Sequence, residues 1–202
     1  MNRISKEYRY NAGFLVVFTA PSGAGKTTIR DGLLSERPDI LYSISATTRD
    51  KRPGEEDGVD YFFVKEDRFR EMIQNDELLE WAEVHGHYYG TPKSFVKKNI
   101  KKGKIIIMDI DVQGGVNVKK RFPDAVFVFI LPPSFEELRK RLNERGTDSM
   151  ETIDLRLENA KKEIALMYNY NYLVINENIK KFSDFRNTGF FAGISFICSG
   201  KT

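Results

Sequence analysis

The sequence predicts an α/β protein whose parallel sheet is flanked by helices, and three observations carry this prediction. Four segments are almost entirely apolar, namely Phe14–Thr19, Lys104–Ile110, Ala125–Leu131 and Tyr172–Ile175. Such runs are typical of strands covered on both faces, as in a parallel sheet. Helical patterns lie between these runs, and strands that alternate with helices favour an α/β fold. We expect the helices at Thr27–Ser35, Lys93–Lys102, Val112–Arg121, Phe135–Arg145 and Thr152–Tyr168.

Length and composition indicate an ordinary globular protein. The chain has 202 residues, 41% hydrophobic and 30% charged, and its 32 basic and 29 acidic residues give a net charge of +3. That near balance disfavours nucleic acid as a partner. The single cysteine, Cys198, excludes an internal disulfide framework and favours a reducing compartment. Residues 1–12 lack a signal-peptide core and no apolar run reaches membrane-spanning length, so we expect a cytoplasmic protein without membrane contact.

The first predicted strand leads into a sequence typical of phosphate binding. It reads Ala20-Pro21-Ser22-Gly23-Ala24-Gly25-Lys26-Thr27-Thr28, which matches G-x-x-x-x-G-K-[ST] except for its first glycine, replaced by Ala20. Small residues let backbone N–H groups converge on phosphate oxygens, and the start of the next helix favours the same anion. Lys26 would then contact the β- and γ-phosphates, and the Thr27 hydroxyl would hold Mg²⁺. The alternative is a purely structural glycine-rich turn.

Two segments interrupt the alternation of strands and helices. Residues 43–92 contain aromatic-rich strand candidates at Tyr42–Thr47, Asp60–Val64 and Glu80–Val84 around a helix at Glu66–Gln74, which predicts an inserted α+β subdomain. Residues 133–168 are helical and highly charged, which suits a mobile lid. We therefore expect one domain over residues 1–202, with its core at about 13–42, 93–132 and 169–182 and an atypical tail at 183–202.

The inserted segment opens with a candidate site for a second phosphate group. Arg49 and Arg52 lie three residues apart, and Tyr61 follows them. Arginine binds phosphate through two parallel hydrogen bonds, and a tyrosine hydroxyl adds a directed donor. Considered by itself, this cluster is equally compatible with a solvated charged loop.

A set of motifs in fixed order resembles the guanylate kinase family, whose members phosphorylate GMP with ATP. The motifs are A-P-S-G-A-G-K-T, T-T-R-x-x-R-x-G-E-x-x-G-x-x-Y-x-F, L-x-E-W-A, Y-Y-G-T and I-M-D-I-D-V-Q-G, and the resemblance runs from about Phe14 to Asn176. It implies a P-loop NTPase-type core, a GMP-binding insertion and a lid that closes over ATP. The implied reaction is Mg²⁺-dependent transfer of the ATP γ-phosphoryl group to GMP, giving GDP and ADP, in purine nucleotide metabolism.

The resemblance also assigns GMP-binding residues by matching position. Arg49, Arg52, Tyr61 and Tyr89 would hold the GMP phosphate, and Ser45, Glu80, Thr91, Asp109 and Asp111 would face or support guanine. The chemistry agrees, because guanine offers N1–H and N2–H₂ donors on one edge, which a carboxylate such as that of Glu80 can accept. A hydroxyl such as that of Thr91 can donate to guanine O6. The alternative for Glu80 is an exposed carboxylate on a strand.

Further residues are implied on the ATP side. Arg141, Arg145 and Arg156 of the lid would reach the ATP phosphates and, with Lys26 and Arg49, form the catalytic set. Asn176 matches an adenine-side asparagine, and Asp109 resembles the carboxylate that assists Mg²⁺, directly or through water. The alternatives are three solvated helix arginines, and an aspartate that caps the next helix. His85 and His87 lack the surrounding ligands of a zinc site, and we interpret both as loop residues.

Two other functions remain open at this point. A non-catalytic guanylate-kinase-like interaction module would keep the fold but have little need for Lys26 and Thr27, and a P-loop kinase acting on a ribose phosphate would have little use for Glu80. A monomer and a homodimer are both compatible with the sequence. The C-terminus departs from the family, since residues 188–200 are uncharged where a charged helix is usual. An edge strand, an adhesive tail and a shifted reading frame are the alternatives there.

Overall fold

The computed structural model describes residues 13–84, 86–144, 149–177 and 196–198. These belong to two compact units. We call Met1–Leu15 with Asp39–Met108 the insertion unit, and Val16–Pro38 with Asp109–Thr202 the phosphate-loop unit. Within the described ranges, no helix is both long enough and apolar enough to cross a membrane.

A six-stranded sheet has the strand order β10-β9-β8-β1-β7-β2. Its strands are β1 (Phe14–Thr19), β2 (Leu41–Tyr42), β7 (Ile105–Asp109), β8 (Val126–Leu131), β9 (Tyr172–Ile175) and β10 (Phe196–Cys198). β1 pairs in parallel with β8 and β8 with β9, with Val16 opposite Val126 and Val128 opposite Tyr172. β2 is parallel to β7, whereas β10 runs antiparallel to β9. Residues 15–18 and 127–130 are at most 3% exposed, so these apolar strands are covered on both faces.

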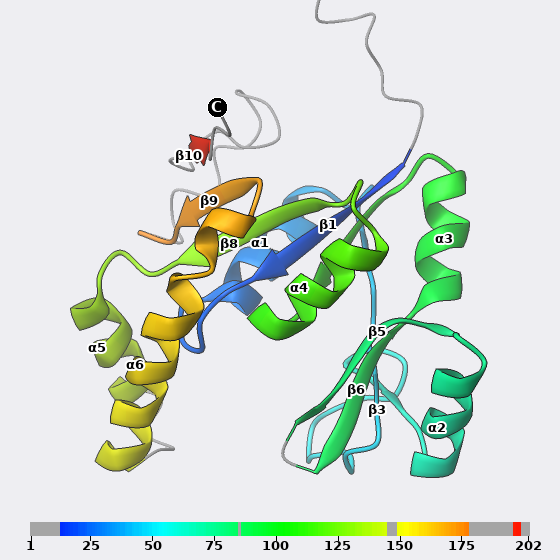
Figure 1. Cartoon of the computed structure of the whole chain (residues 1–202), viewed down its shortest axis with the longest axis horizontal. Helices are drawn as coiled ribbons and strands as arrows, with labels where there is room; N and C mark the ends of the chain where they lie inside the picture. Colours follow the sequence, from blue (N-terminus) through cyan, green and yellow to red (C-terminus); the bar gives the residue numbers. More distant parts are fainter. Residues whose placement is uncertain (1–12, 85, 145–148, 178–195, 199–202) are drawn as a thin grey trace, which may run out of the picture. The chain divides into compact units, whose positions relative to one another are not determined.

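Two helices of the phosphate-loop unit cover opposite faces of β1 and β8, as Figure 1 shows. They are α1 (Lys26–Glu36), which buries Ile29 and Leu33, and α4 (Val112–Arg121). α4 begins where the side chain of Asp111 accepts a hydrogen bond from the N–H of Gly114 at 2.6 Å. Gly115 lets α4 approach β1 closely, because a Cβ atom there would lie 2.9 Å from Cγ2 of Thr19.

The helices α5 (Phe135–Glu144) and α6 (Met150–Ile164) pack against each other along a small apolar core. It consists of Leu138, Leu142, Ile153, Leu157 and Ala160. Ser149 caps α6 by accepting a hydrogen bond from the N–H of Thr152, and a short 3₁₀ helix, η2 (Met167–Asn169), leads into β9. Figure 1 shows α5 and α6 side by side.

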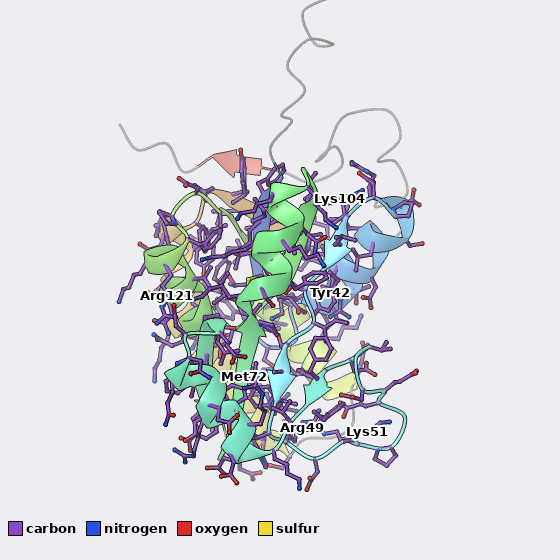
Figure 2. All side chains as sticks on the ribbon, turned by 90° about the vertical axis from the view of Figure 1, so that its right-hand side faces the viewer. Tyr42, Arg49, Lys51, Met72, Lys104 and Arg121 are labelled. Atoms are coloured by element: carbon purple, nitrogen blue, oxygen red, sulfur yellow. The ribbon has the colours of Figure 1, made fainter. Side chains whose placement is uncertain are left out.

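The insertion unit contains a four-stranded sheet with the order β4-β3-β6-β5. The strands are β3 (Ala46–Thr47), β4 (Phe62–Phe63), β5 (Leu78–Val84) and β6 (His87–Pro92), and α2 (Glu66–Gln74) packs on the sheet through Phe69 and Met72. β6 is antiparallel to both β3 and β5, and α3 (Lys93–Lys101) follows it. Figure 2 shows Met72 on α2, with Arg49 and Lys51 on the loop after β3.

The fold confirms the predicted α/β class and most elements, and it corrects three. The expected strand Tyr42–Thr47 is two short strands, β2 and β3, which belong to different sheets. The expected helix Thr152–Tyr168 ends at Ile164, because the chain tightens into η2 before β9. His87, expected in a loop, begins strand β6, while His85 lies outside the described residues. In the tail, the edge-strand alternative holds for Phe196–Cys198.

Candidate active site

The predicted phosphate loop joins β1 to α1 and has the backbone geometry that anion binding requires. Gly23 and Gly25 have φ angles of +89° and +92°, a left-handed conformation that favours glycine. Gly25 is the N-cap of α1 and provides no side-chain acceptor for the N–H groups of the first helical turn. These N–H groups can therefore serve an anion at the helix N-terminus.

Lys26, the first residue of α1, is held by the main chain. Its Nζ donates a hydrogen bond to the carbonyl oxygen of Ile110 at 2.8 Å, just beyond the end of β7. Burial lowers the pKa of the Lys26 ammonium, and the nearby carboxylates of Asp109 and Asp111 partly oppose this shift. An anion at the loop would favour the charged form, so the site suits a phosphate group.

Asp109, the last residue of β7, and Asp111, two residues further on, have different partners. The Oδ2 atom of Asp109 lies 3.3 Å from Nη1 of Arg30, whereas Asp111 caps α4. The predicted alternative of a capping role is therefore confirmed for Asp111. Nothing in that contact prevents Asp111 from also binding a ligand, since a carboxylate has further acceptor sites.

Thr27 and Asp109 fit the predicted Mg²⁺. Both offer oxygen atoms, the ligands that Mg²⁺ prefers, and the Thr27 residue is exposed. Within the described ranges, no three or more His, Cys, Asp or Glu residues gather into a metal site of their own. Mg²⁺ commonly keeps several waters and binds substrate phosphates with one or two carboxylates, so a donor set as small as Thr27 and Asp109 is compatible with it.

Arg141 and Asn176 meet at the phosphate loop. Nδ2 of Asn176 donates to the carbonyl oxygen of Ala24 at 2.8 Å, and Nη2 of Arg141 donates to the carbonyl oxygen of Asn176 at 3.0 Å. Of the other two lid arginines, Arg156 lies on α6, and Arg145 is outside the described residues. Among the described residues, Arg141 is therefore a predicted lid arginine that contacts the loop.

In the insertion unit, Arg49 lies among aromatic rings and a carboxylate. Its Nη2 contacts both oxygens of Glu55 at 2.7 and 3.0 Å, and its guanidinium lies 5.6 Å from the ring centre of Tyr61. The hydrogen bond to Glu55 raises the pKa of Arg49 and lowers that of Glu55. Tyr61 makes an edge contact with Tyr89, while Arg52 is exposed and donates its backbone N–H to Glu55. Arg49, Tyr61 and Tyr89, three of the four residues predicted to bind the GMP phosphate, therefore form one cluster of contacting side chains.

Glu80 and Thr91 form a buried pair in the same unit. The Thr91 hydroxyl donates to Oε1 of Glu80 at 2.8 Å, and the two residues are 0% and 7% exposed respectively. Thr91 and Tyr89 lie two residues apart on β6 and so share a face of the sheet, about 7 Å apart. Ser45 immediately precedes β3, the strand beside β6. The predicted base-reading residue Thr91 and the predicted phosphate-binding residue Tyr89 therefore lie on one face of the sheet.

Three residues that contribute to these sites were missed by the sequence reasoning. Glu55 holds Arg49, and its position in the R-x-x-R-x-G-E motif was an available signal. Arg30 contacts Asp109 from α1, one helical turn after Lys26. Glu163 of α6 lies near Lys26 and Asp111, and burial raises the pKa of its carboxyl. No signal local to Glu163 predicted this, because the proximity arises from tertiary packing.

The fold and the loop together define a P-loop nucleotide-binding protein. A sequence model described as "Guanylate kinase" matches residues 13–184. A guanylate kinase from Caldanaerobacter subterraneus is 51% identical over 84% of this chain and 82% of its own, and one from Thermotoga maritima is 48% identical over 83% and 81%. The crystal structure of guanylate kinase from Anaplasma phagocytophilum superposes with a TM-score of 0.69 at 34% identity, covering 86% of this chain and 82% of that one. The chain belongs to the guanylate kinase family.

Proposed function

We propose that this protein transfers the γ-phosphoryl group of ATP to GMP in a Mg²⁺-dependent reaction that yields ADP and GDP. The observation that carries the acceptor assignment is the buried Glu80–Thr91 pair, on the same sheet face as Tyr89. Membership of the guanylate kinase family supports the same assignment. The intact Lys26 and Thr27 supply the ATP side and disfavour a non-catalytic interaction module.

The hydrogen-bond acceptors and donors of Glu80 and Thr91 explain why guanine would be selected. An ionised Glu80 only accepts, so it can take both N1–H and N2–H₂ of guanine, a donor pair that adenine lacks. The Thr91 hydroxyl already donates its proton to Glu80. In this arrangement Thr91 holds the carboxylate, and its free lone pairs can accept a further N–H. Donation to guanine O6, as expected from the sequence, requires that the hydroxyl rotate.

The acceptor phosphate needs no general base. Its second pKa is near ~6, so the attacking oxygen is already anionic at neutral pH. In the transfer, this oxygen forms a bond to the γ-phosphorus while the bond from the γ-phosphorus to the β–γ bridging oxygen breaks, and ADP leaves with that electron pair. Arg49 and Tyr61 position the acceptor, and Lys26 neutralises charge on the donor phosphates. When bound by Thr27 and Asp109, Mg²⁺ supplies further charge neutralisation.

Arg49 exchanges partners when GMP binds. In the structure the guanidinium of Arg49 contacts Glu55, and a phosphate dianion carries more charge than a carboxylate and offers the same paired oxygens. Ser45, Arg52, Asp109 and Asp111 remain proposed GMP contacts, and Arg141, Arg145 and Arg156 remain proposed contacts to ATP. The cytoplasmic location, the monomer or homodimer and the domain boundaries also remain predictions.

A coupled assay of ADP formation with GMP, AMP, CMP and a ribose phosphate tests the proposal. Rapid turnover with GMP, and weak or no turnover with the other acceptors, is the expected result. Absence of GMP-dependent turnover at millimolar nucleotide would refute the proposal, and preference for the ribose phosphate would favour a different P-loop kinase. Omission of Mg²⁺ or addition of EDTA should abolish the activity, which checks the metal requirement.

A further inference from the structure

The carbonyl group of Ala24, in the middle of the phosphate loop, receives two side-chain donors. Nδ2 of Asn176 approaches its oxygen at 2.8 Å, and Nη1 of Arg141 at 3.4 Å. A carbonyl oxygen only accepts hydrogen bonds, so the Asn176 atom that faces it must be the amide NH₂. These donors come from residues 152 and 117 positions away along the chain, so the contacts are tertiary.

The two donors also hold each other. Nη2 of Arg141 donates to the backbone carbonyl of Asn176 at 3.0 Å, and Nε of Arg141 contacts Oε1 of Glu137, one turn earlier on α5, at 2.8 Å. Asn176 follows β9 and is only 2% exposed. Arg141 thus connects α5, the end of β9 and the phosphate loop in one hydrogen-bonded group.

The adjacent glycines fit tightly against the same elements. A Cβ atom at Gly25 would overlap Nδ2 of Asn176, and one at Gly23 would lie 2.9 Å from Cδ2 of Leu142 on α5. Leu142 and Leu138 are fully buried. The loop therefore rests on Asn176 on one side and on α5 on another, which fixes the direction of its N–H groups.

We infer that Asn176 and Arg141 are positioning residues that clamp the Ala24 carbonyl, and that Asn176 acts on the ATP phosphates through the loop. This role is additional to the adenine contact predicted for Asn176 from the sequence, which stays a prediction. The side-chain NH₂ donates to Ala24, whereas Oδ1 of Asn176 is buried and has no hydrogen-bond partner among the described residues, so it could still accept a hydrogen bond from a base. The inference rests on the proposed function only in taking the loop as the ATP site.

The test separates the phosphates from the base by using inorganic tripolyphosphate, which has no adenine. Binding of Mg-tripolyphosphate and of a non-hydrolysable ATP analogue is measured by calorimetry for the wild type and for Asn176→Ala. Loss of one hydrogen bond to the loop should weaken tripolyphosphate binding by about three- to tenfold, and binding of the ATP analogue by at least the same factor. Weaker ATP-analogue binding with unchanged tripolyphosphate binding would overturn the clamp in favour of adenine recognition.

Two further variants sharpen the result. Asn176→Asp keeps an acceptor oxygen for adenine but places a carboxylate against the Ala24 carbonyl, so it should weaken tripolyphosphate binding at least as much as Asn176→Ala. Equal binding by Asn176→Asp and the wild type would contradict the clamp. In a double-mutant cycle with Arg141→Met, the two losses should be non-additive, because both side chains act on one carbonyl.

A control at the other end of β9 excludes a general stability effect. Oδ1 of Asn171 accepts a hydrogen bond from the backbone N–H of Phe127 at 2.9 Å, so Asn171→Ala also removes an asparagine contact to the main chain. We expect it to lower Tm without changing tripolyphosphate affinity or KM for ATP. If Asn171→Ala and Asn176→Ala weaken binding equally, the clamp is refuted. GMP turnover is measured on the same samples, so failure of the proposed reaction is recognised independently.

Discussion

The functional side chains of the phosphate loop and those of the candidate GMP site are held in place by different kinds of contact. In the phosphate-loop unit, the side chains that lie at the loop bind the main chain, as Lys26 does at Ile110 and Asn176 at Ala24. In the insertion unit, the functional side chains bind one another, as Arg49 does with Glu55 and Thr91 with Glu80. The loop site is therefore set by the course of the backbone, and the acceptor site by a side-chain network.

This difference explains which substrate each region can discriminate. Triphosphate binding uses N–H groups and a lysine, groups that carry no information about the base. A buried carboxylate with a fixed hydroxyl presents a defined pattern of acceptors, which rejects a base that cannot complete it. We expect substitutions in the loop to affect the rate with any acceptor, and substitutions in the insertion to affect selectivity.

The largest effect should come from Lys26→Met. It removes the positive charge at the loop while keeping a side chain of similar length, so kcat should fall by about 10²–10³-fold or more. KM for GMP should change little, because the acceptor site is built separately. Steady-state kinetics with both substrates varied measure this, and a large rise in KM for GMP would show that the two regions are not independent.

The next largest effect should come from Glu80→Gln. The amide keeps the shape but replaces one acceptor oxygen by a donor, so kcat/KM for GMP should fall by about 10- to 100-fold with ATP binding unchanged. The ratio of GMP to AMP turnover is the decisive measurement, and an unchanged ratio would refute the assignment. Glu83→Gln, an exposed position on the same strand, is the matched control.

Thr91→Val should have a smaller effect on the same region. Valine has nearly the shape of threonine but leaves Oε1 of Glu80 without its hydroxyl donor. We expect KM for GMP to rise by about three- to tenfold and stability to fall by about 1–2 kcal/mol, measured by kinetics and urea unfolding. Thr91→Ser retains the hydroxyl and should keep most of the affinity; a Ser variant as impaired as Val would contradict the role of the hydrogen bond.

The smallest effect concerns Glu163, the buried carboxyl near Lys26. Burial and the Asp111 carboxylate raise its pKa, so the folded state binds the proton more tightly than the unfolded state does. Its contribution to stability therefore falls as pH rises from the ordinary value of about 4.3 through the raised value. Glu163→Gln should raise Tm slightly at pH 7, by at most about 2 °C, and the gain should vanish near pH 4.

The control for this prediction is Glu158→Gln on the same helix. A hydrogen bond from Lys161 lowers the pKa of Glu158, so its contribution to stability is present at neutral pH and lost as pH falls through that lowered value. Thermal unfolding from pH 4 to pH 8 should therefore show opposite signs for the two variants. The same sign for both would contradict the assignment for Glu163.

By itself, the sequence determined the α/β class and the phosphate loop, and it predicted the residues of the acceptor site. It could do so because these features are local: β1 and β9 are continuous apolar runs, and Lys26 and Thr27 follow a glycine pattern that few other structures need. The candidate site for a second phosphate group was also predicted from the sequence, because Arg49, Arg52 and Tyr61 lie close together along the chain.

Only the tertiary structure decided what each of these residues contacts. The partners of Ala24 come from α5 and from the end of β9, and Glu163 approaches Lys26 from α6. Whether Tyr42–Thr47 forms one strand or two depended on which sheet each end joins. Such contacts arise from the packing of segments distant in sequence, and no local pattern of polarity or periodicity encodes the partner.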